Sequence, residues 1–194
     1  ERMSTPVLGV AEIPASIVSR PAACSAAWTM SASIRPDGRL SRGDIVKFDA
    51  QVRVSHYYSD IGRSFVVGTP FPEQERVYEG LMEAHERARE ALRPGVRICD
   101  LYAAAMEPLR RRGFRRYSRG HFGHSIGLDP KCEEPPFLSW DETRPLEPGL
   151  VLSVETPFYC RGFGSIQLED VCLITADGHE VLNHLPRELV LVDG

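Results

Sequence analysis

Apolar and polar positions alternate along residues 45–67, in two stretches that Ser55 and His56 separate. Alternation with a period of two is typical of strands with one buried face. The pattern therefore predicts two strands over 45–67, and the later stretches 151–159 and 165–175 predict two more. A short extended segment is also expected at 16–19.

Helical spacing replaces this alternation in the middle of the chain. Apolar residues recur every three or four positions over 77–92 and again over 101–109. Pro94-Gly95 is a strong stop signal after the first of these segments, and the second is expected to open near Asp100 and to stop at Gly113. The sequence thus predicts two consecutive helices.

The rest of the second half is expected to be irregular before the last two strands. Residues 120–127 are rich in Gly and His and predict a loop, and the Pro-rich stretch 130–148 predicts a connection. The order of strands, helices and strands indicates the α+β class, with a mostly antiparallel sheet covered by helices.

Composition narrows the class of protein. The 194 residues are 42% hydrophobic and 26% charged, which is typical of a globular domain. No apolar run is long enough for a membrane span, and a formal net charge of -4 argues against general nucleic-acid binding. The five cysteines are odd in number and form no CxxC pair, so we expect a reducing, cytoplasmic location.

An internal repeat carries part of the acidic charge. The segments Leu40-Ser-Arg-Gly-Asp-Ile-Val-Lys-Phe-Asp49 and Leu146-Glu-Pro-Gly-Leu-Val-Leu-Ser-Val-Glu155 share a Leu, a Gly three positions on, and a carboxylate six positions after the Gly. In each case the next strand bears another acid, Asp60 or Glu169. We expect one domain over 1–194 that consists of two related halves, at about 1–112 and 113–194.

The repeated acids are expected to lie together. Asp49 shares a strand face with Lys47 and Gln51, opposite the apolar Phe48 and Val52. Two facing hairpins would direct four carboxylates into one space, where they would raise one another's pKa unless cations neutralised them. Hard divalent ions prefer such oxygen ligands. The alternative is four unrelated surface acids, which is the usual fate of Asp and Glu.

The histidine motif decides between these alternatives. The loop Gly120-His-Phe-Gly-His124-Ser-Ile-Gly127 lies between the two hairpins, and glycines beside a His allow its imidazole to approach a metal. Five candidate ligands, four carboxylates and one imidazole, occur along the chain in the order Asp49, Asp60, His124, Glu155 and Glu169. With this order, residues 37–182 resemble the pita-bread metallopeptidases, which include methionine aminopeptidase, Xaa-Pro aminopeptidase, prolidase and creatinase.

The resemblance is greatest to the Xaa-Pro branch, and it implies the fold and the chemistry. The fold would be a pita-bread sheet with pseudo-twofold halves. Asp49 would hold one divalent metal ion, His124 and Glu155 the other, and Asp60 and Glu169 would bridge the two. An Asp/Glu/His site accepts manganese, cobalt, zinc or iron. A hydroxide between the ions would attack a small peptide or another small molecule, with Glu155 moving the proton. The resemblance leaves a homodimer open.

The chain departs from the family pattern near the metal-binding His. Seven residues after His124, where the peptidases place a second His, stands Lys131, a donor with a fixed charge. His121 is expected to supply an imidazole, although the Xaa-Pro peptidases place that residue one position earlier. The catalytic candidates are therefore Glu155, His121 and Lys131. Only about 40 residues precede the first hairpin, so we expect the N-terminal part of the family's domain to be missing.

These departures keep two alternatives open. In the first, the protein is a creatinase-like C–N hydrolase or a lyase, and Lys131 binds a carboxylate of a non-peptide substrate. In the second, it is a catalytically silent binding module, as in the histone-chaperone use of this fold. The Arg-rich segment 110–119 is interpreted as a helix terminus that continues into a solvated loop, or as a patch that steers an anionic substrate.

Overall fold

The computed structural model describes residues 40–114, 117–129, 133–160 and 163–192. The extended segment expected at 16–19 and the candidate Lys131 lie outside these ranges. The elements are β1 Ile45–Val54, β2 Tyr57–Val67, α2 Pro72–Glu90, α3 Ile98–Arg111, β3 His121–Ser125, β4 Glu134–Ser139, β5 Val151–Glu155, β6 Phe158–Cys160, β7 Gly164–Ile166, β8 Glu169–Ile174, β9 His179–Val181 and β10 Val190–Val192.

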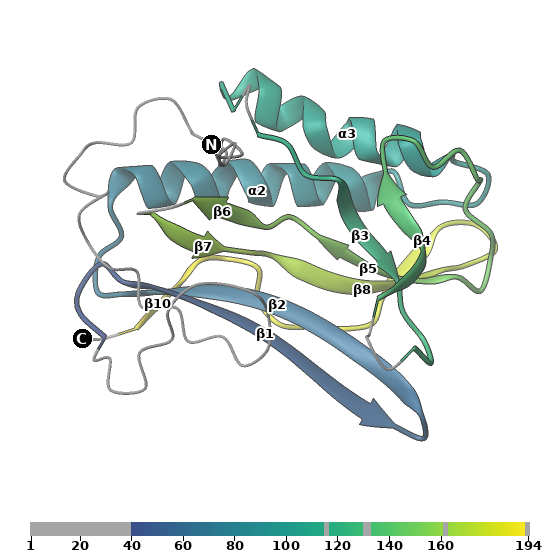
Figure 1. The fold of residues 1–194 in the computed structure, drawn as a ribbon, viewed down its shortest axis with the longest axis horizontal. Helices are drawn as coiled ribbons and strands as arrows, with labels where there is room; N and C mark the ends of the chain where they lie inside the picture. Colours follow the sequence, from purple (N-terminus) through teal and green to yellow (C-terminus); the bar gives the residue numbers. More distant parts are fainter. Residues whose placement is uncertain (1–39, 115–116, 130–132, 161–162, 193–194) are drawn as a thin grey trace, which may run out of the picture.

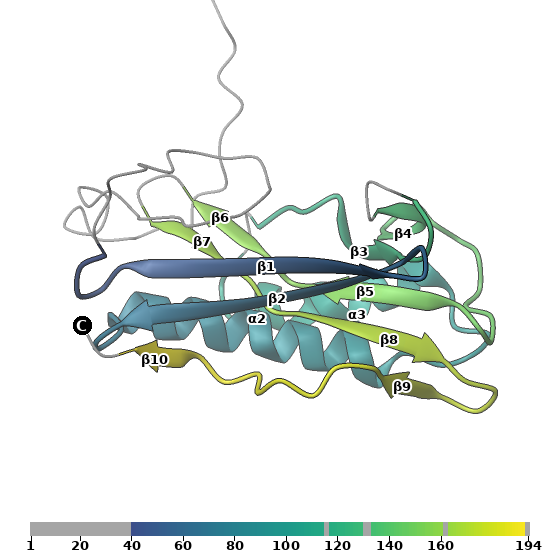
Figure 2. The ribbon, with the colours of Figure 1, turned by 90° about the horizontal axis from the view of Figure 1, so that it is seen from below.

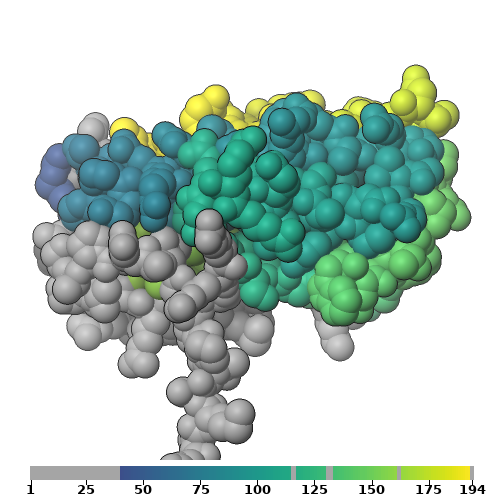
Figure 3. Space-filling view, turned by 90° about the horizontal axis from the view of Figure 1, so that it is seen from above, coloured from purple at the N-terminus to yellow at the C-terminus, as the bar shows by residue number. Residues whose placement is uncertain are grey.

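The strands confirm the predicted α+β class and the antiparallel sheet. The main sheet has the order β1-β2-β8-β5-β3-β4, with β9 paired to β8 and β10 paired parallel to β2, while β6 and β7 form a separate ribbon. Helices α2 and α3 lie side by side on one face of the sheet (Figures 1 and 2). The space-filling view shows them as a continuous layer over that face (Figure 3).

The first strand pair is a long hairpin with a tight turn. Ser55 and His56 both have positive φ, at 49° and 74°, which is the backbone of the type I′ turns that suit the twist of paired strands. The register that follows places Asp49 opposite Gly62 and Gln51 opposite Asp60. The turn thus determines which residues of β1 lie beside the acid of β2.

The two repeated strand pairs meet in the middle of the sheet. The second strand of the first repeat, β2, pairs with the second strand of the other, β8, through Gly62 and Glu169. Glu169 is in turn opposite Glu155 on β5. The order β1-β2-β8-β5 is therefore symmetric about this junction, and the repeat brings its acids to the centre.

The structure corrects the expectations for two segments. The Gly- and His-rich loop is the strand β3, paired with both β4 and β5, and the Pro-rich connection contains the strand β4. Gly123 has a φ of +130°, and a Cβ there would lie 1.9 Å from the Ser153 carbonyl oxygen. Both features require glycine, which allows the close approach of the strands. Pro135 and Pro136 are tolerated because β4 is at the edge of the sheet.

The last two expected strands are each interrupted. The segment 151–159 divides into β5 and β6, and 165–175 divides into β7 and β8. The Thr156 amide donates a hydrogen bond to the Leu168 carbonyl at 2.8 Å, between these pairs. The interruption lets β6 and β7 leave the main sheet while Glu155 and Glu169 remain at its centre.

The hydrophobic core lies between the helices and the sheet. The apolar faces predicted for both helices are buried, and they pack in one cluster with inward side chains of β4 and β5. The principal members are Leu81, Ala84, Ala88, Leu101, Ala105, Leu109, Leu138, Leu152 and Val154. Neither of the described helices is apolar over a length that would let it cross a membrane.

A buried ionic network supports the middle of the sheet. The carboxylate of Asp170, fully buried on β8, accepts hydrogen bonds from Arg63 Nη2 at 2.6 Å, His85 Nε2 at 3.0 Å, Asn183 Nδ2 at 2.5 Å and Arg187 Nε at 2.5 Å. Burial alone would raise the pKa of Asp170, but these donors outweigh it and hold the pKa well below the usual range. The network joins β2, α2 and the C-terminal segment to β8.

We expect Asp170→Asn to lower the free energy of unfolding by about 3–5 kcal/mol, because it leaves buried cations without their counter-charge. Urea denaturation at pH 7 measures this loss. The matched control is Asp177→Asn, an exposed residue in the turn after the same strand. A loss no larger than that of the control would contradict the role given to this network.

Candidate metal centre

The five predicted ligands come from five strands of the main sheet. Asp49 lies in β1, Asp60 in β2 and His124 in β3, while Glu155 ends β5 and Glu169 begins β8. These five strands are successive neighbours in the main sheet, in the order β1-β2-β8-β5-β3. The sheet itself therefore positions the ligands, without long loops.

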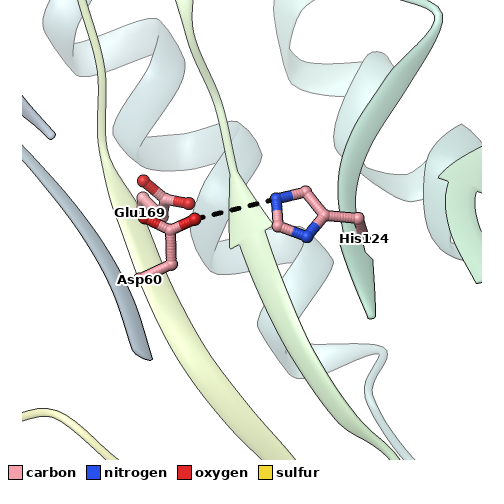
Figure 4. A group of neighbouring side chains, drawn as sticks. All are labelled: Asp60, His124 and Glu169. Atoms are coloured by element: carbon pink, nitrogen blue, oxygen red, sulfur yellow. Dashed lines mark ion pairs between the residues drawn. The ribbon is translucent and has the colours of Figure 1, made fainter. Parts of the chain in front are cut away.

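Three of the five have ligand atoms within 4.8 Å of one another, namely Asp60, His124 and Glu169. All three side chains are buried, and His124 Nε2 faces Asp60 Oδ2 across 4.0 Å (Figure 4). Two carboxylates and one imidazole at this spacing are a suitable donor set for a divalent transition metal.

The orientation of His124 suits a metal ligand. Its Nδ1 lies 3.0 Å from the carbonyl oxygen of Ser125, which accepts hydrogen bonds but does not donate them. Nδ1 therefore carries the proton, and Nε2 is left with a lone pair that faces the carboxylates. A backbone carbonyl behind the distal nitrogen is the usual device that fixes the tautomer of a metal-binding His.

The other two predicted ligands flank this group and are paired with cations. Asp49 Oδ2 accepts a hydrogen bond from Lys47 Nζ at 2.9 Å. Glu155 Oε1 accepts one from Arg119 Nη2 at 2.7 Å and lies 3.7 Å from His121 Nδ1. The outer carboxylates are thus partly neutralised by side chains of the protein.

Neutral donors orient the inner carboxylates. Ser153 Oγ donates to Glu169 Oε1 at 2.5 Å, and Gln167 Nε2 donates to Glu169 Oε2 at 2.6 Å. Gln51 Nε2 donates to Asp60 Oδ2 at 3.1 Å. Gly62 leaves room for this arrangement, because a Cβ there would lie 2.7 Å from Glu169 Oε2.

The electrostatics of the group call for a cation. Burial, followed by the charge of Asp49, raises the pKa of Asp60 to about 8. Burial and the neighbouring charges of Asp60 and Glu155 raise the pKa of Glu169 well above its usual value. Asp60 Oδ1 is buried and accepts no hydrogen bond within the part of the chain that the structure describes. These residues fit a divalent ion, which would neutralise them and occupy that oxygen.

The structure brings together every predicted ligand, and His121 beside them, while Lys131 lies outside the described residues. Burial and the charge of Arg119 lower the pKa of His121, which favours its neutral imidazole. The sequence did not predict Gln167, Ser153 or Arg119 as neighbours of the site. For Gln167 the available signal was its position two residues before Glu169, on the same side of the chain.

The arginines of the Arg-rich segment form ion pairs in two different environments. Arg111 and Arg112 form ion pairs with Glu83 of the neighbouring helix, in agreement with a helix terminus at the surface. Arg119, by contrast, has its side chain about three-quarters buried against Glu155. The segment therefore begins on the surface and ends in the candidate site.

Comparison with known proteins agrees with this geometry. The profile of metallopeptidase family M24 matches residues 10–176. An Xaa-Pro dipeptidase of Pyrococcus furiosus is 37% identical over 157 residues, which is 81% of this chain and 44% of that protein. The chain therefore spans less than half the length of this relative.

Solved structures show the same fold. A dipeptidase, PepE, from Mycobacterium ulcerans superposes with a TM-score of 0.77 at 33% identity, over 81% of this chain and 42% of that one. The prolidase from Pyrococcus horikoshii superposes with a TM-score of 0.75 at 34% identity, over 79% of this chain and 44% of that one. Both comparisons support the pita-bread fold expected from the sequence.

We expect the metal-free chain to lose stability as the pH rises from about 4 to about 8. The folded state holds protons on Asp60 and Glu169 that the unfolded state releases in this window, so each added unit of pH favours unfolding. Asp60→Asn removes one of these two titrating carboxyls, so over this window the wild type should lose about 1–2 kcal/mol more of its free energy of unfolding than the variant does. Urea denaturation at several pH values measures the difference.

Manganese provides the control for this prediction. A bound divalent ion replaces the protons, so added Mn²⁺ should remove the downward trend in the wild type. If, without metal, the free energy of unfolding changed with pH in the same way in the wild type and in Asp60→Asn, proton uptake by Asp60 in the folded state would be contradicted.

Proposed function

Because the chain belongs to metallopeptidase family M24, we propose that it forms the catalytic part of a dinuclear metal peptidase that cleaves small Xaa-Pro peptides. The observation that carries this proposal is the buried group of Asp60, His124 and Glu169, flanked by Asp49 and Glu155. A buried set of ligands serves little purpose in a binding surface, which argues against a silent module. Two divalent ions held there would supply a nucleophilic hydroxide and would polarise the scissile carbonyl.

Each ligand has a distinct place in this proposal. Asp49 would hold one ion, and His124 and Glu155 would hold the other. Asp60 and Glu169 would be shared by the two ions, in keeping with the pairing of their strands β2 and β8. Their raised pKa values describe the metal-free protein, in which protons take the place of the cations. Manganese, cobalt, zinc and iron all suit this donor set.

Glu155 is the proton carrier in the proposed reaction. Its carboxylate takes a proton from the attacking water and delivers it to the leaving amine. The ion pair with Arg119 engages one oxygen of this carboxylate, Oε1. His121, 3.7 Å from the same carboxylate, is placed to donate a hydrogen bond to the substrate from a neutral ring.

Three further parts of the proposal rest on the sequence. The single catalytic domain with halves at about 1–112 and 113–194 follows from the repeat. The cytoplasmic location follows from the cysteine pattern. Assembly as a homodimer is proposed without a defined interface.

A second candidate function is a C–N hydrolase or lyase that acts on a small non-peptide molecule. Lys131 favours it, because the peptidases have a His at this position. Its fixed charge suits a substrate carboxylate better than proton transfer near neutral pH.

With Mn²⁺ or Co²⁺ bound, the purified chain should hydrolyse Xaa-Pro dipeptides, and chelation should abolish the activity. Glu155→Gln should lower kcat by at least about 10²-fold, since it removes the proton carrier. Amino acid release measures the rates, and the exposed Glu147→Gln is the matched control. Metal analysis of each variant distinguishes loss of catalysis from loss of metal. Turnover that survives both chelation and Glu155→Gln would refute the proposal.

The substitution Lys131→His separates the two candidate functions. For a peptidase, the added imidazole should raise kcat on Xaa-Pro dipeptides by about tenfold or more, because it can exchange a proton near neutral pH. For the C–N hydrolase or lyase, neither the wild type nor the variant should cleave these peptides in spite of a full metal content. The same release assay and metal analysis decide the question.

A further inference from the structure

Two basic side chains lie beside the carboxylates of the centre, and both contact Tyr159 of β6. The Nζ atom of Lys47 lies 3.2 Å from the Tyr159 hydroxyl and 5.3 Å from the centre of its ring. The guanidinium carbon of Arg119 lies 5.8 Å from the centre of the same ring. Both distances suit cation–π contacts, so the two cations lie close to one aromatic ring. Lys47 and Arg119 are called the cation pair below.

The fold holds both members of the cation pair in place. The alternation of β1 directs Lys47 to the same face as Asp49, whose Oδ2 lies 2.9 Å from the Lys47 Nζ. The backbone of Arg119 is anchored to α3, because the Tyr102 hydroxyl donates to the Arg119 carbonyl at 2.6 Å. Arg119 Nη2 donates to Glu155 Oε1 at 2.7 Å, while its buried Nε has no hydrogen-bond partner among the described residues. Arg119 can therefore donate to a further acceptor.

The formal charges show what the cation pair faces in a loaded centre. In the metal-free chain, Lys47 and Arg119 neutralise Asp49 and Glu155 through direct ion pairs. The four carboxylates of the centre carry -4 when ionised, so two bound divalent ions would balance them completely. The attacking hydroxide adds -1 and the cation pair adds +2. The loaded centre therefore keeps an excess of one positive charge.

This excess charge is poorly solvated. The side chain of Lys47 is 4% exposed and that of Arg119 is 26% exposed. Water screens charges weakly in such surroundings, so an anionic group of the substrate gains more there than at the surface. A zwitterionic dipeptide with a neutral side chain leaves the excess unchanged, because its ammonium and its carboxylate cancel. A dipeptide with an acidic side chain carries -1 and removes it.

We propose that the cation pair selects Xaa-Pro substrates in which Xaa is acidic, either Asp or Glu. This inference rests on the proposed function and specifies its substrate class. The side-chain carboxylate of Xaa accepts hydrogen bonds from the Lys47 ammonium and from Arg119 Nε. Tyr159 keeps the Lys47 ammonium in position when Asp49 is engaged by metal.

Hydrolysis of Glu-Pro and Gln-Pro by the Mn²⁺-loaded chain tests the selection, because the two peptides have nearly the same shape and differ in charge. We expect kcat/KM for Glu-Pro to exceed that for Gln-Pro by at least about tenfold. Lys47→Met keeps the length of the side chain and removes its charge, and it should lower this ratio by at least about threefold. Arg119→Met should lower it similarly. The ratio of two substrates cancels any loss of kcat that both share.

A binding measurement separates recognition from catalysis. Reduced analogues of the two peptides, in which a CH₂ group replaces the scissile carbonyl, are not hydrolysed. Calorimetry with the Mn²⁺-loaded chain should give a Kd for the Glu analogue at least about tenfold below that for the Gln analogue. Lys47→Met should narrow this difference by at least about threefold. Metal analysis of each sample distinguishes a loss of affinity from a loss of metal.

The matched control is Arg87→Met, which removes an exposed cation from α2 and should leave both ratios unchanged. Equal kcat/KM for Glu-Pro and Gln-Pro in the wild type would overturn the selection. So would the wild-type ratio in both Lys47→Met and Arg119→Met. Thermal unfolding shows whether each variant folds, and the wild-type comparison needs no variant.

The proposed function fails in a different way. If the fully metal-loaded wild type cleaves neither Glu-Pro nor any other Xaa-Pro dipeptide, the peptidase assignment is refuted. The affinities of the two analogues then still decide whether the cation pair selects an acidic side chain, because they do not depend on turnover.

Discussion

Mutual repulsion among buried carboxylates is the constraint on which this structure depends. Asp60 and Glu169 are both buried: burial and the charge of Asp49 raise the pKa of Asp60, and burial and the charge of Asp60 raise the pKa of Glu169. Such a group persists in a fold only if protons, cations or metal ions neutralise it. In the metal-free protein protons and the neighbouring cations meet this requirement, and a bound ion would replace the protons.

A second buried carboxylate that needs neutralisation lies one residue further along β8. Asp170 follows Glu169 directly, and its charge is compensated within the protein by Arg63 and Arg187, while His85 donates a hydrogen bond. Arg63 also donates to the backbone carbonyl of Glu169 at 2.5 Å, and so connects the two layers of charge. One carboxylate of the pair is thus permanently neutralised and holds the strand, while the other is left for exchangeable cations.

The sequence predicted the grouping of the acids better than it predicted their surroundings. The repeat predicts that Asp49, Asp60, Glu155 and Glu169 lie near one another, and the structure places them on neighbouring strands, because covalent order and strand alternation decide which acids face one another. The sequence predicts a loop where strand β3 lies, since Gly123 indicates a loop unless the close approach of Ser153 is known. The proximity of Arg119 to Glu155 depends on tertiary packing, which no local pattern reports.

The internal repeat makes the backbone symmetric, but the charges around the site are not. His124 comes from β3 and Lys47 from β1, and neither has a counterpart of the same kind in the other repeat: Ser153 occupies the position equivalent to Lys47. Ser153 donates a neutral hydrogen bond to Glu169, whereas Lys47 places a full positive charge on Asp49. The positive charge on Glu155 comes instead from Arg119, which lies outside the repeated strand pairs. The two outer carboxylates are therefore both paired with cations, but the cations come from unrelated positions of the chain.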